Sequence, residues 1–140
     1  MHKEAIKWYK LAADQEFPDA QYNLGSMYDF GNGVPQDYKE AIKWYRLSAN
    51  QGYSPAQHNL GVMYNLGKGV RQDYKEAFKW YKLSANQGYS SAQLNLGILY
   101  EEGNGVRQNH SIAKEYYGKS CNNGLQIGCD YYKDLNQKGY

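Results

Sequence analysis

The sequence has no long apolar run and no strong excess of charge. None of its apolar stretches approaches the roughly 20 residues that a membrane-spanning helix needs, so we expect no membrane span. The net charge of the 140 residues is only +2, and the basic side chains are interspersed with acidic ones. Nucleic-acid binding usually needs a basic patch or stripe, so we do not expect a nucleic-acid partner.

Metal-binding side chains are also scarce. The chain has two cysteines, Cys121 and Cys129, and three scattered histidines, His2, His58 and His110. A structural zinc site needs about four ligands. No strand followed by a glycine-rich phosphate loop is predicted either. The sequence therefore predicts no metal site and no cofactor.

What the sequence does contain is an internal repeat. The block 37–72 returns as 73–108 with 27 of 36 positions identical, and weaker copies occupy 1–36 and 109–140. Repeats of this length are stacked units that bury their apolar faces against their neighbours. We therefore predict a single domain over residues 1–140 with these four repeat phases.

Each repeat carries the signals of two helices. In the first, called helix A, Ser54 and Gln57 are spaced as a capping box, and Ser90 and Gln93 repeat the pattern. Gly67 predicts a left-handed cap at the end of this helix. Small residues recur where the helices must approach closely.

The second helix, called helix B, opens at Asp37 with Glu40 in its first turn. Asn109 belongs to a formal glycosylation sequon, but it stands at the same place and is predicted to be an N-cap. The order is B-A repeated four times, which makes eight helices. Many tyrosines keep a fixed phase, so we interpret them as packing residues (Tyr28, Tyr45, Tyr64, Tyr81 and Tyr100).

The repeated motifs resemble the Sel-one-like repeats, which are relatives of the tetratricopeptide repeats. The resemblance rests on three boxes in fixed order: Ala56-Gln57-x-Asn59-Leu60-Gly61-x-x-Tyr64, Gly67-x-Gly69-Val70 and Asp73-Tyr74-x-Glu76-Ala77-x-x-Trp80-Tyr81. It implies an all-α fold, a tetratricopeptide-like α/α solenoid or superhelix of about four helix pairs with helix A on a concave face. It also implies a bacterial-type, non-catalytic scaffold or adaptor for protein complexes.

The last repeat resembles the secreted cysteine-rich branch of this family. In that branch, a Cys-x7-Cys pair joins the end of helix B to the following helix A, and Cys121 and Cys129 have this spacing. The resemblance implies a disulfide and a periplasmic or secreted location. The alternative is a pair of reduced thiols in a cytoplasmic protein.

Some members of the cysteine-rich branch are described as penicillin-binding or β-lactamase-like, which is the alternative function. One Ser-x-x-Lys motif is present, formed by Ser111 and Lys114. The chain contains no threonine, so no Lys-Thr-Gly can accompany it, and no Ser-Asp-Asn is present. We therefore expect no catalytic residue.

We expect the outward positions of helix A to bind a peptide or protein segment. Several of these positions differ between the second and third repeats, whereas the packing positions mostly agree. A purely architectural spacer is a further alternative. The predicted peptide-binding residues are Tyr22, Asn23, Ser26, Asp29, His58, Asn59, Val62, Asn65, Leu94, Asn95, Ile98 and Glu101.

One asparagine recurs in this set, at Asn23, Asn59 and Asn95. A side-chain amide can donate to and accept from the backbone of an extended peptide. It can equally bond to the adjacent helix, and the sequence leaves these two roles open.

The two ends of the array carry separate expectations. Ile6 and Tyr9 have no preceding helix A to cover them, which predicts self-association through this edge. Met1 is in register with Asp37, in mid-repeat, so the chain is expected to be part of a longer protein. The segment 130–138 is polar on the face that would meet another repeat, which predicts a C-terminal capping helix.

Overall fold

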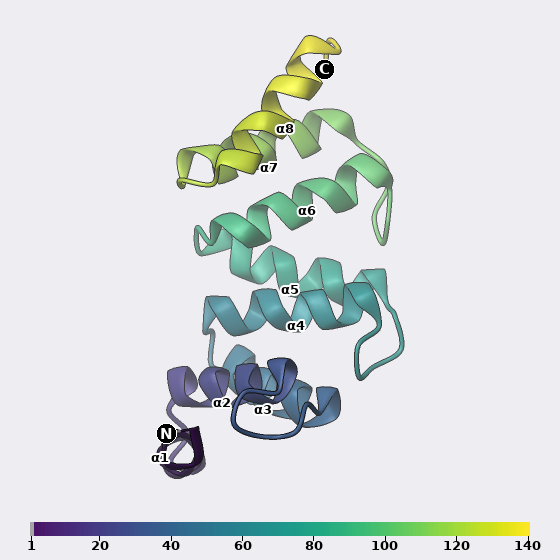
Figure 1. The fold of residues 1–140 in the computed structure, drawn as a ribbon. Coiled ribbons are helices and arrows are strands. Elements are labelled where there is room, and N and C mark those ends of the chain that lie inside the picture. Colours follow the sequence, from purple (N-terminus) through teal and green to yellow (C-terminus); the bar gives the residue numbers. More distant parts are fainter. Residues whose placement is uncertain (1) are drawn as a thin grey trace. The chain divides into compact units, whose positions relative to one another are not determined.

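The computed structural model describes the backbone of residues 2–140 and the side chains of residues 4–140. Met1 and the side chain of His2 lie outside the described residues. Every regular element in the described range is a helix, and their order confirms the predicted eight-helix pattern (Figure 1). The helices are α1 (His2–Asp14), α2 (Pro18–Phe30), α3 (Tyr38–Asn50), α4 (Ser54–Leu66), α5 (Tyr74–Asn86), α6 (Ser90–Glu102), α7 (His110–Asn122) and α8 (Gln126–Gln137).

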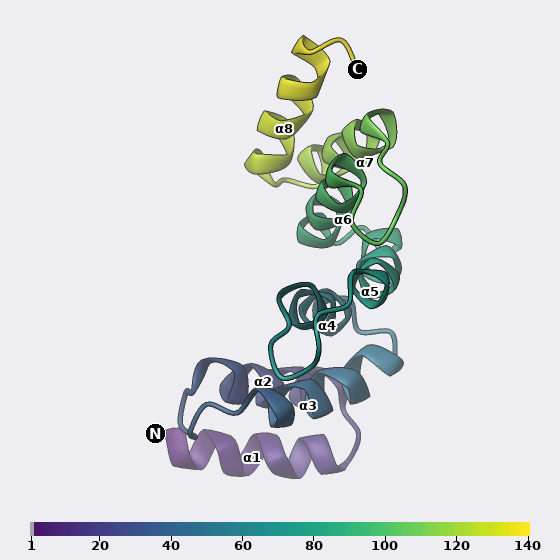
Figure 2. The same ribbon diagram turned by 90° about the vertical axis from the view of Figure 1, so that its right-hand side faces the viewer.

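The helices form two compact units, and each unit is a stack of consecutive helices. The first unit, Met1–Gln72, contains α1 to α4, and the second unit, Asp73–Tyr140, contains α5 to α8. Within each unit every helix packs on the next one in sequence, as Figure 2 shows for α1, α2 and α3. Helices α1, α3, α5 and α7 are the B helices, and α2, α4, α6 and α8 are the A helices. The fold is therefore an all-α solenoid of helix pairs.

The polar caps of the B helices form as predicted. The Asp37 carboxylate caps α3 by accepting hydrogen bonds from the backbone N–H groups of Lys39 and Glu40. The Asn109 side chain accepts one from the N–H of Ile112 at 3.0 Å. These bonds satisfy donors that the first turn of a helix leaves unpaired. Helices α2, α4 and α6 end in left-handed glycines, with a φ of 69° at Gly67, whereas the C-cap of α8 is Lys138.

The predicted capping box of helix A is wrong. The N-cap of α4 is Tyr53, which makes no side-chain cap bond, and Ser54 is already the first helical residue. The Gln57 amide instead donates to the carbonyl oxygen of Ala49 at 3.2 Å. Ala49 lies in the last turn of α3, where carbonyl groups lack partners within the helix. The same bond joins Gln21 to Ala13 at 3.4 Å and Gln93 to Ala85 at 3.2 Å.

Close packing of the helix pairs depends on small residues, as predicted. A Cβ atom added at Gly25 would lie 2.7 Å from the ring of Tyr45, and one at Gly97 would lie 2.6 Å from the ring of Tyr117. Both tyrosines are almost completely buried. The glycines therefore let the A helix approach the tyrosine ring of the B helix that follows it.

Candidate binding face and pocket

The outward positions of helix A are half-buried surface positions, with one exception. Eleven of the twelve predicted peptide-binding residues are half-buried, and Asp29 is buried. Eight of them lie on α2 and α4 of the first unit, and four lie on α6 of the second unit. We call these twelve residues the helix A face.

In the first unit, Asp29 has a packing role. Its Oδ2 accepts a hydrogen bond of 2.9 Å from the Tyr45 hydroxyl, which is also buried. Burial raises the pKa of Tyr45, so this hydroxyl keeps its proton and acts as the donor. The contact of Asp29 with a peptide stays a prediction.

Three other residues of the helix A face meet between α2 and α4. The Asn59 amide lies 3.5 Å from the Tyr22 hydroxyl as a donor, and its oxygen lies 3.0 Å from Nδ1 of His58. The Tyr22 ring packs on the rings of Tyr45 and Tyr53. Burial lowers the pKa of His58, so a neutral ring with a proton on Nδ1 suits this contact. Of the two roles left open for Asn59, the bond to the adjacent helix is the one present here.

The three asparagines of the column differ in their surroundings. No side-chain hydrogen bond joins Asn23 to another of the described residues. Asn23 lines a pocket of about 370 Å³ between α1 and α2, together with Trp8 and Phe17. Asn95 lies half-buried on α6 in the second unit. The role of the column as a peptide contact stays a prediction.

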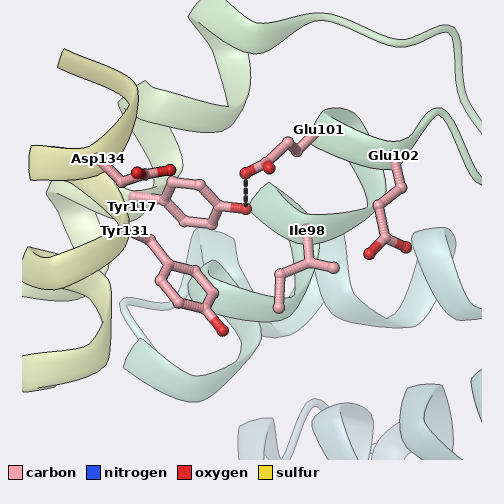
Figure 3. Close-up of a pocket in the computed structure, with 6 residues that line it drawn as sticks. All are labelled: Ile98, Glu101, Glu102, Tyr117, Tyr131 and Asp134. Carbon is pink, nitrogen blue, oxygen red and sulfur yellow. Dashed lines mark hydrogen bonds between the residues drawn. The ribbon is translucent and has the colours of Figure 1, made fainter. Parts of the chain in front are cut away.

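The second unit has a pocket in which helix A residues are joined by neighbours from α7 and α8. Its volume is about 190 Å³. Figure 3 shows the side chain of Ile98 between those of Tyr131 and Glu102. The lining residues are Ile98, Glu101 and Glu102 of α6, Tyr117 of α7, and Tyr131 and Asp134 of α8. We call this site the α6–α8 pocket.

Each carboxylate of the α6–α8 pocket has one hydrogen-bonded partner. The Tyr117 hydroxyl donates to Oε1 of Glu101 at 2.8 Å (Figure 3). The Asn104 amide donates to Oε2 of Glu102 at 3.0 Å. The third carboxylate, of Asp134, forms an exposed ion pair with Lys138, the C-cap residue of α8, at 3.0 Å. A carboxylate has two oxygens and about four lone-pair sites, so each retains capacity for a further donor.

The aromatic part of the pocket is fixed by packing. The Tyr131 ring meets the Tyr117 ring edge to face, with centroids 5.2 Å apart. Burial raises the pKa of Tyr117, and the bond to Glu101 raises it further. The Tyr117 hydroxyl therefore stays protonated and holds Glu101 in place.

The sequence analysis missed four residues of this pocket, Glu102, Tyr117, Tyr131 and Asp134. The repeat itself carried a usable signal. One repeat further on, the asparagine column continues at Tyr131, and the column of Ser26, Val62 and Ile98 continues at Asp134. The helix that contains them was interpreted as a polar cap, so the columns were not extended.

The two cysteines form a disulfide, as the resemblance implies. Their Cα atoms are 4.5 Å apart, and the bond links the end of α7 to the first turn of α8. Cys121 is in register with Ala85, and Cys129 is in register with Gln93. The disulfide therefore occupies the place where the earlier repeats have a hydrogen bond from glutamine to the alanine carbonyl.

The Ser-x-x-Lys motif has no arrangement that favours catalysis. Ser111 is an exposed residue in the first turn of α7. The ammonium group of Lys114 donates to Oδ1 of Asn136 at 2.8 Å and to the main-chain oxygen of Tyr140 at 2.6 Å. No hydrogen bond joins Lys114 to Ser111 among the described residues. These contacts provide no observation in favour of the β-lactamase-like alternative.

The described part of the chain offers neither a metal-binding cluster nor a membrane-spanning helix. There, no three or more His, Cys, Asp and Glu side chains are grouped so that they could hold a metal ion. No helix in residues 2–140 has the length and apolar character needed to cross a membrane.

The chain is similar to known repeat proteins over nearly its whole length. The Sel1 repeat matches four times, at residues 2–17, 18–53, 54–89 and 90–125. The last three matches begin at an A helix, whereas the phases defined from the sequence begin at helix B; the first match, 2–17, covers the B helix α1. None of the curated proteins matches the chain significantly.

Solved structures give the same result. The chain is 40% identical to c5321, a protective antigen of uropathogenic Escherichia coli with an SLR fold, with a TM-score of 0.96 over 99% of this chain and 30% of that one. A Sel1 repeat protein from Oxalobacter formigenes is 35% identical, with a TM-score of 0.85 over 100% of this chain and 66% of that one. The chain thus spans less than two thirds of either protein.

A third structure, the cysteine rich protein B of Helicobacter pylori, is 22% identical with a TM-score of 0.74. The match covers 92% of each chain. At this identity the likeness concerns the fold alone.

Proposed function

Because this chain belongs to the Sel1 repeat family, whose fold is typically a non-catalytic protein-interaction scaffold, we propose that it binds a peptide or protein segment on its helix A face. The binding is non-catalytic and needs no cofactor. The residues involved are those of the helix A face in each of the two units. Their partner is a protein segment that offers apolar side chains and backbone hydrogen-bonding groups.

One observation carries this proposal. Of the nine differences between the blocks 37–72 and 73–108, four lie at positions 58, 62, 65 and 66 of α4 and the matching positions of α6. This spacing places them on one side of a helix. None of these eight residues is fully buried. The packing of the repeats does not require identity at these positions, so they are free to differ according to the partner.

The residues that form the hydrogen bond from Gln57 to Ala49, unlike the four surface positions, do not vary between the two blocks. Both partners of this bond are buried and are identical in the two blocks. A surface that varies on top of an invariant packing scheme is what a set of binding repeats needs. This pattern supports binding on the helix A face over a role as a spacer.

The proposal is tested by selecting binding peptides from a displayed random library with the whole chain. The test variant carries Val62→Ala and Ile98→Ala, which trim apolar side chains of the helix A face. The matched control carries Leu47→Ala and Leu83→Ala, which trim exposed apolar side chains of two B helices. We expect the test variant to bind the selected peptides about tenfold more weakly, which corresponds to a loss of about 1.4 kcal/mol. Failure to select any peptide, or an equal loss in the control, would refute the proposal.

We propose in addition that the protein works in an oxidising compartment. The bond between Cys121 and Cys129 is compatible with a periplasmic or secreted location, since such compartments preserve disulfides. The test is to trap free thiols with a maleimide in intact native cells before lysis. An unlabelled pair is expected, and full labelling of both cysteines would indicate the cytoplasm.

A further inference from the structure

We infer that the α6–α8 pocket binds one basic side chain, an arginine or a lysine, of the bound protein segment. This inference deepens the proposed function and rests on it. It specifies the type of side chain that the second unit would bind in its partner.

The size of the pocket favours a single side chain. Sites for drug-sized ligands and cofactors usually enclose about 300–1,000 Å³. The α6–α8 pocket has about 190 Å³, which is too small for such a ligand. A side chain projecting from a peptide on the adjacent helix A face can enter a space of this size.

The residues that line the pocket favour a cationic side chain with an apolar stem. Ile98 and the Tyr131 ring supply apolar surface, while Glu101, Glu102 and Asp134 supply carboxylates (Figure 3). An arginine packs its methylene groups on apolar surface and donates from its planar head to carboxylates. Its head can also lie on the face of a tyrosine ring. Lysine fits the same walls as a point charge.

Two of the three carboxylates in this pocket are not part of the repeated pattern, which indicates a role in binding a partner and not in packing. Asp29 and Glu101 occupy the same position and both bind a tyrosine hydroxyl. The other two carboxylates have no acidic counterpart in the first unit. Glu102 is in register with Phe30, and Asp134 is in register with Val62. The helix pairs of the first unit pack without these charges.

The carboxylates are accessible to an incoming cation. Both side chains of the ion pair between Asp134 and Lys138 are more than half exposed to solvent. Such exposed pairs are screened by solvent and contribute little, so Lys138 is a weak competitor.

The test compares two charge-neutralised variants of the whole chain against the library-selected peptides. The pocket variant carries Glu102→Gln and Asp134→Asn, which leave the bond between Tyr117 and Glu101 in place. The control carries Glu115→Gln and Asp130→Asn, two carboxylates of the second unit that do not line the pocket. Both variants lose the same net charge, and both are checked for an unchanged unfolding midpoint.

We expect the peptides selected by the unaltered chain to share one Arg or Lys at a fixed position. Replacing that residue by norleucine, or using the pocket variant, should weaken binding about tenfold, the size of one lost charge-assisted hydrogen bond. The control variant should bind as the unaltered chain does. A Tyr131→Ala variant should also bind more weakly.

Two kinds of outcome separate this inference from the proposed function. Peptides that bind the helix A face without a shared basic residue, or equal losses in the pocket and control variants, would overturn the inference and leave the proposed function standing. If no peptide is selected at all, both the inference and the proposed function are refuted.

Discussion

A tyrosine hydroxyl bound to a carboxylate is one polar contact that recurs in the two units. Tyr45 donates to Asp29 at 2.9 Å in the first unit, and Tyr117 donates to Glu101 at 2.8 Å in the second. In each case the tyrosine comes from a B helix and the carboxylate from the last turns of the A helix before it. A buried carboxylate without a donor is costly, so the bond to the buried Asp29 favours the pairing of α2 with α3; Glu101 is only half-buried.

This contact leads to a prediction about Tyr45→Phe. Removing the hydroxyl leaves the buried Asp29 carboxylate without its donor, so the free energy of unfolding should fall by about 1–3 kcal/mol. Urea unfolding followed by circular dichroism measures the change. The control is Tyr53→Phe, since the Tyr53 hydroxyl makes no hydrogen bond with other described residues. Equal effects of the two substitutions would contradict the assigned role of the bond.

At the residue scale, the sequence predicted best those contacts that are local in the chain. The Asp37 cap was predictable because its acceptor and donors lie within three residues of each other. The partner of Gln57 was not, because the Ala49 carbonyl comes within reach only after α3 and α4 pack. The same limit applies to Asp29, which was assigned to the surface before its contact with Tyr45 was known.

At the scale of the element, each A helix is attached to the preceding B helix by a bond eight residues apart in sequence. Three repeats use the amide of a glutamine and the carbonyl of an alanine, and the last uses a disulfide. The two solutions occupy the same positions of the repeat. The covalent link lies at α8, which packs within its unit on α7.

Because the hydrogen bond and the disulfide occupy the same positions of the repeat, we predict an order of stability for three proteins. Removing the disulfide in Cys121→Ala/Cys129→Ala should lower the free energy of unfolding by about 2–3 kcal/mol, as expected for so short a loop. The variant Cys121→Ala/Cys129→Gln restores the pair used by the other repeats, and it should recover about 0.5–1.5 kcal/mol of that loss.

Urea unfolding of the three proteins, with and without a reductant, measures this order of stability. The reductant should destabilise only the protein that contains the disulfide. If the Gln variant is no more stable than the double Ala variant, the hydrogen bond does not substitute for the disulfide in this position.

The number and order of the helices could be predicted because each repeat carries its own start and stop signals. The pocket between α6 and α8 could not. Its residues come from three helices, and Tyr131 and Asp134 look like ordinary polar cap residues until α8 is placed beside α6. Extending the columns of the repeat by one copy would have listed both residues, but only packing shows that they line one space.

At the scale of the whole molecule, the three tryptophans, which occupy the same position in successive repeats, show where apolar surface is left uncovered. Trp44 and Trp80 are only 9% and 5% exposed, whereas Trp8 is 66% exposed. Ile6 and Tyr9, the residues first expected at the open edge, are instead partly buried against the core that contains Leu24 and Trp44. The apolar surface at this edge is formed by other residues, chiefly Trp8, Leu11 and Phe17.

This surface leads to the prediction that the chain self-associates through Trp8. Burying a large exposed aromatic side chain is favourable in proportion to its apolar area, so the mass measured by light scattering should rise with protein concentration. Trp8→Ser should reduce the rise and leave the unfolding midpoint nearly unchanged, because an exposed position contributes little to folding. Leu66→Ser is the control, because Leu66 is a similarly exposed apolar residue on α4. A constant monomer mass at high concentration, or an equal reduction by both substitutions, would show that the edge around Trp8 does not drive association.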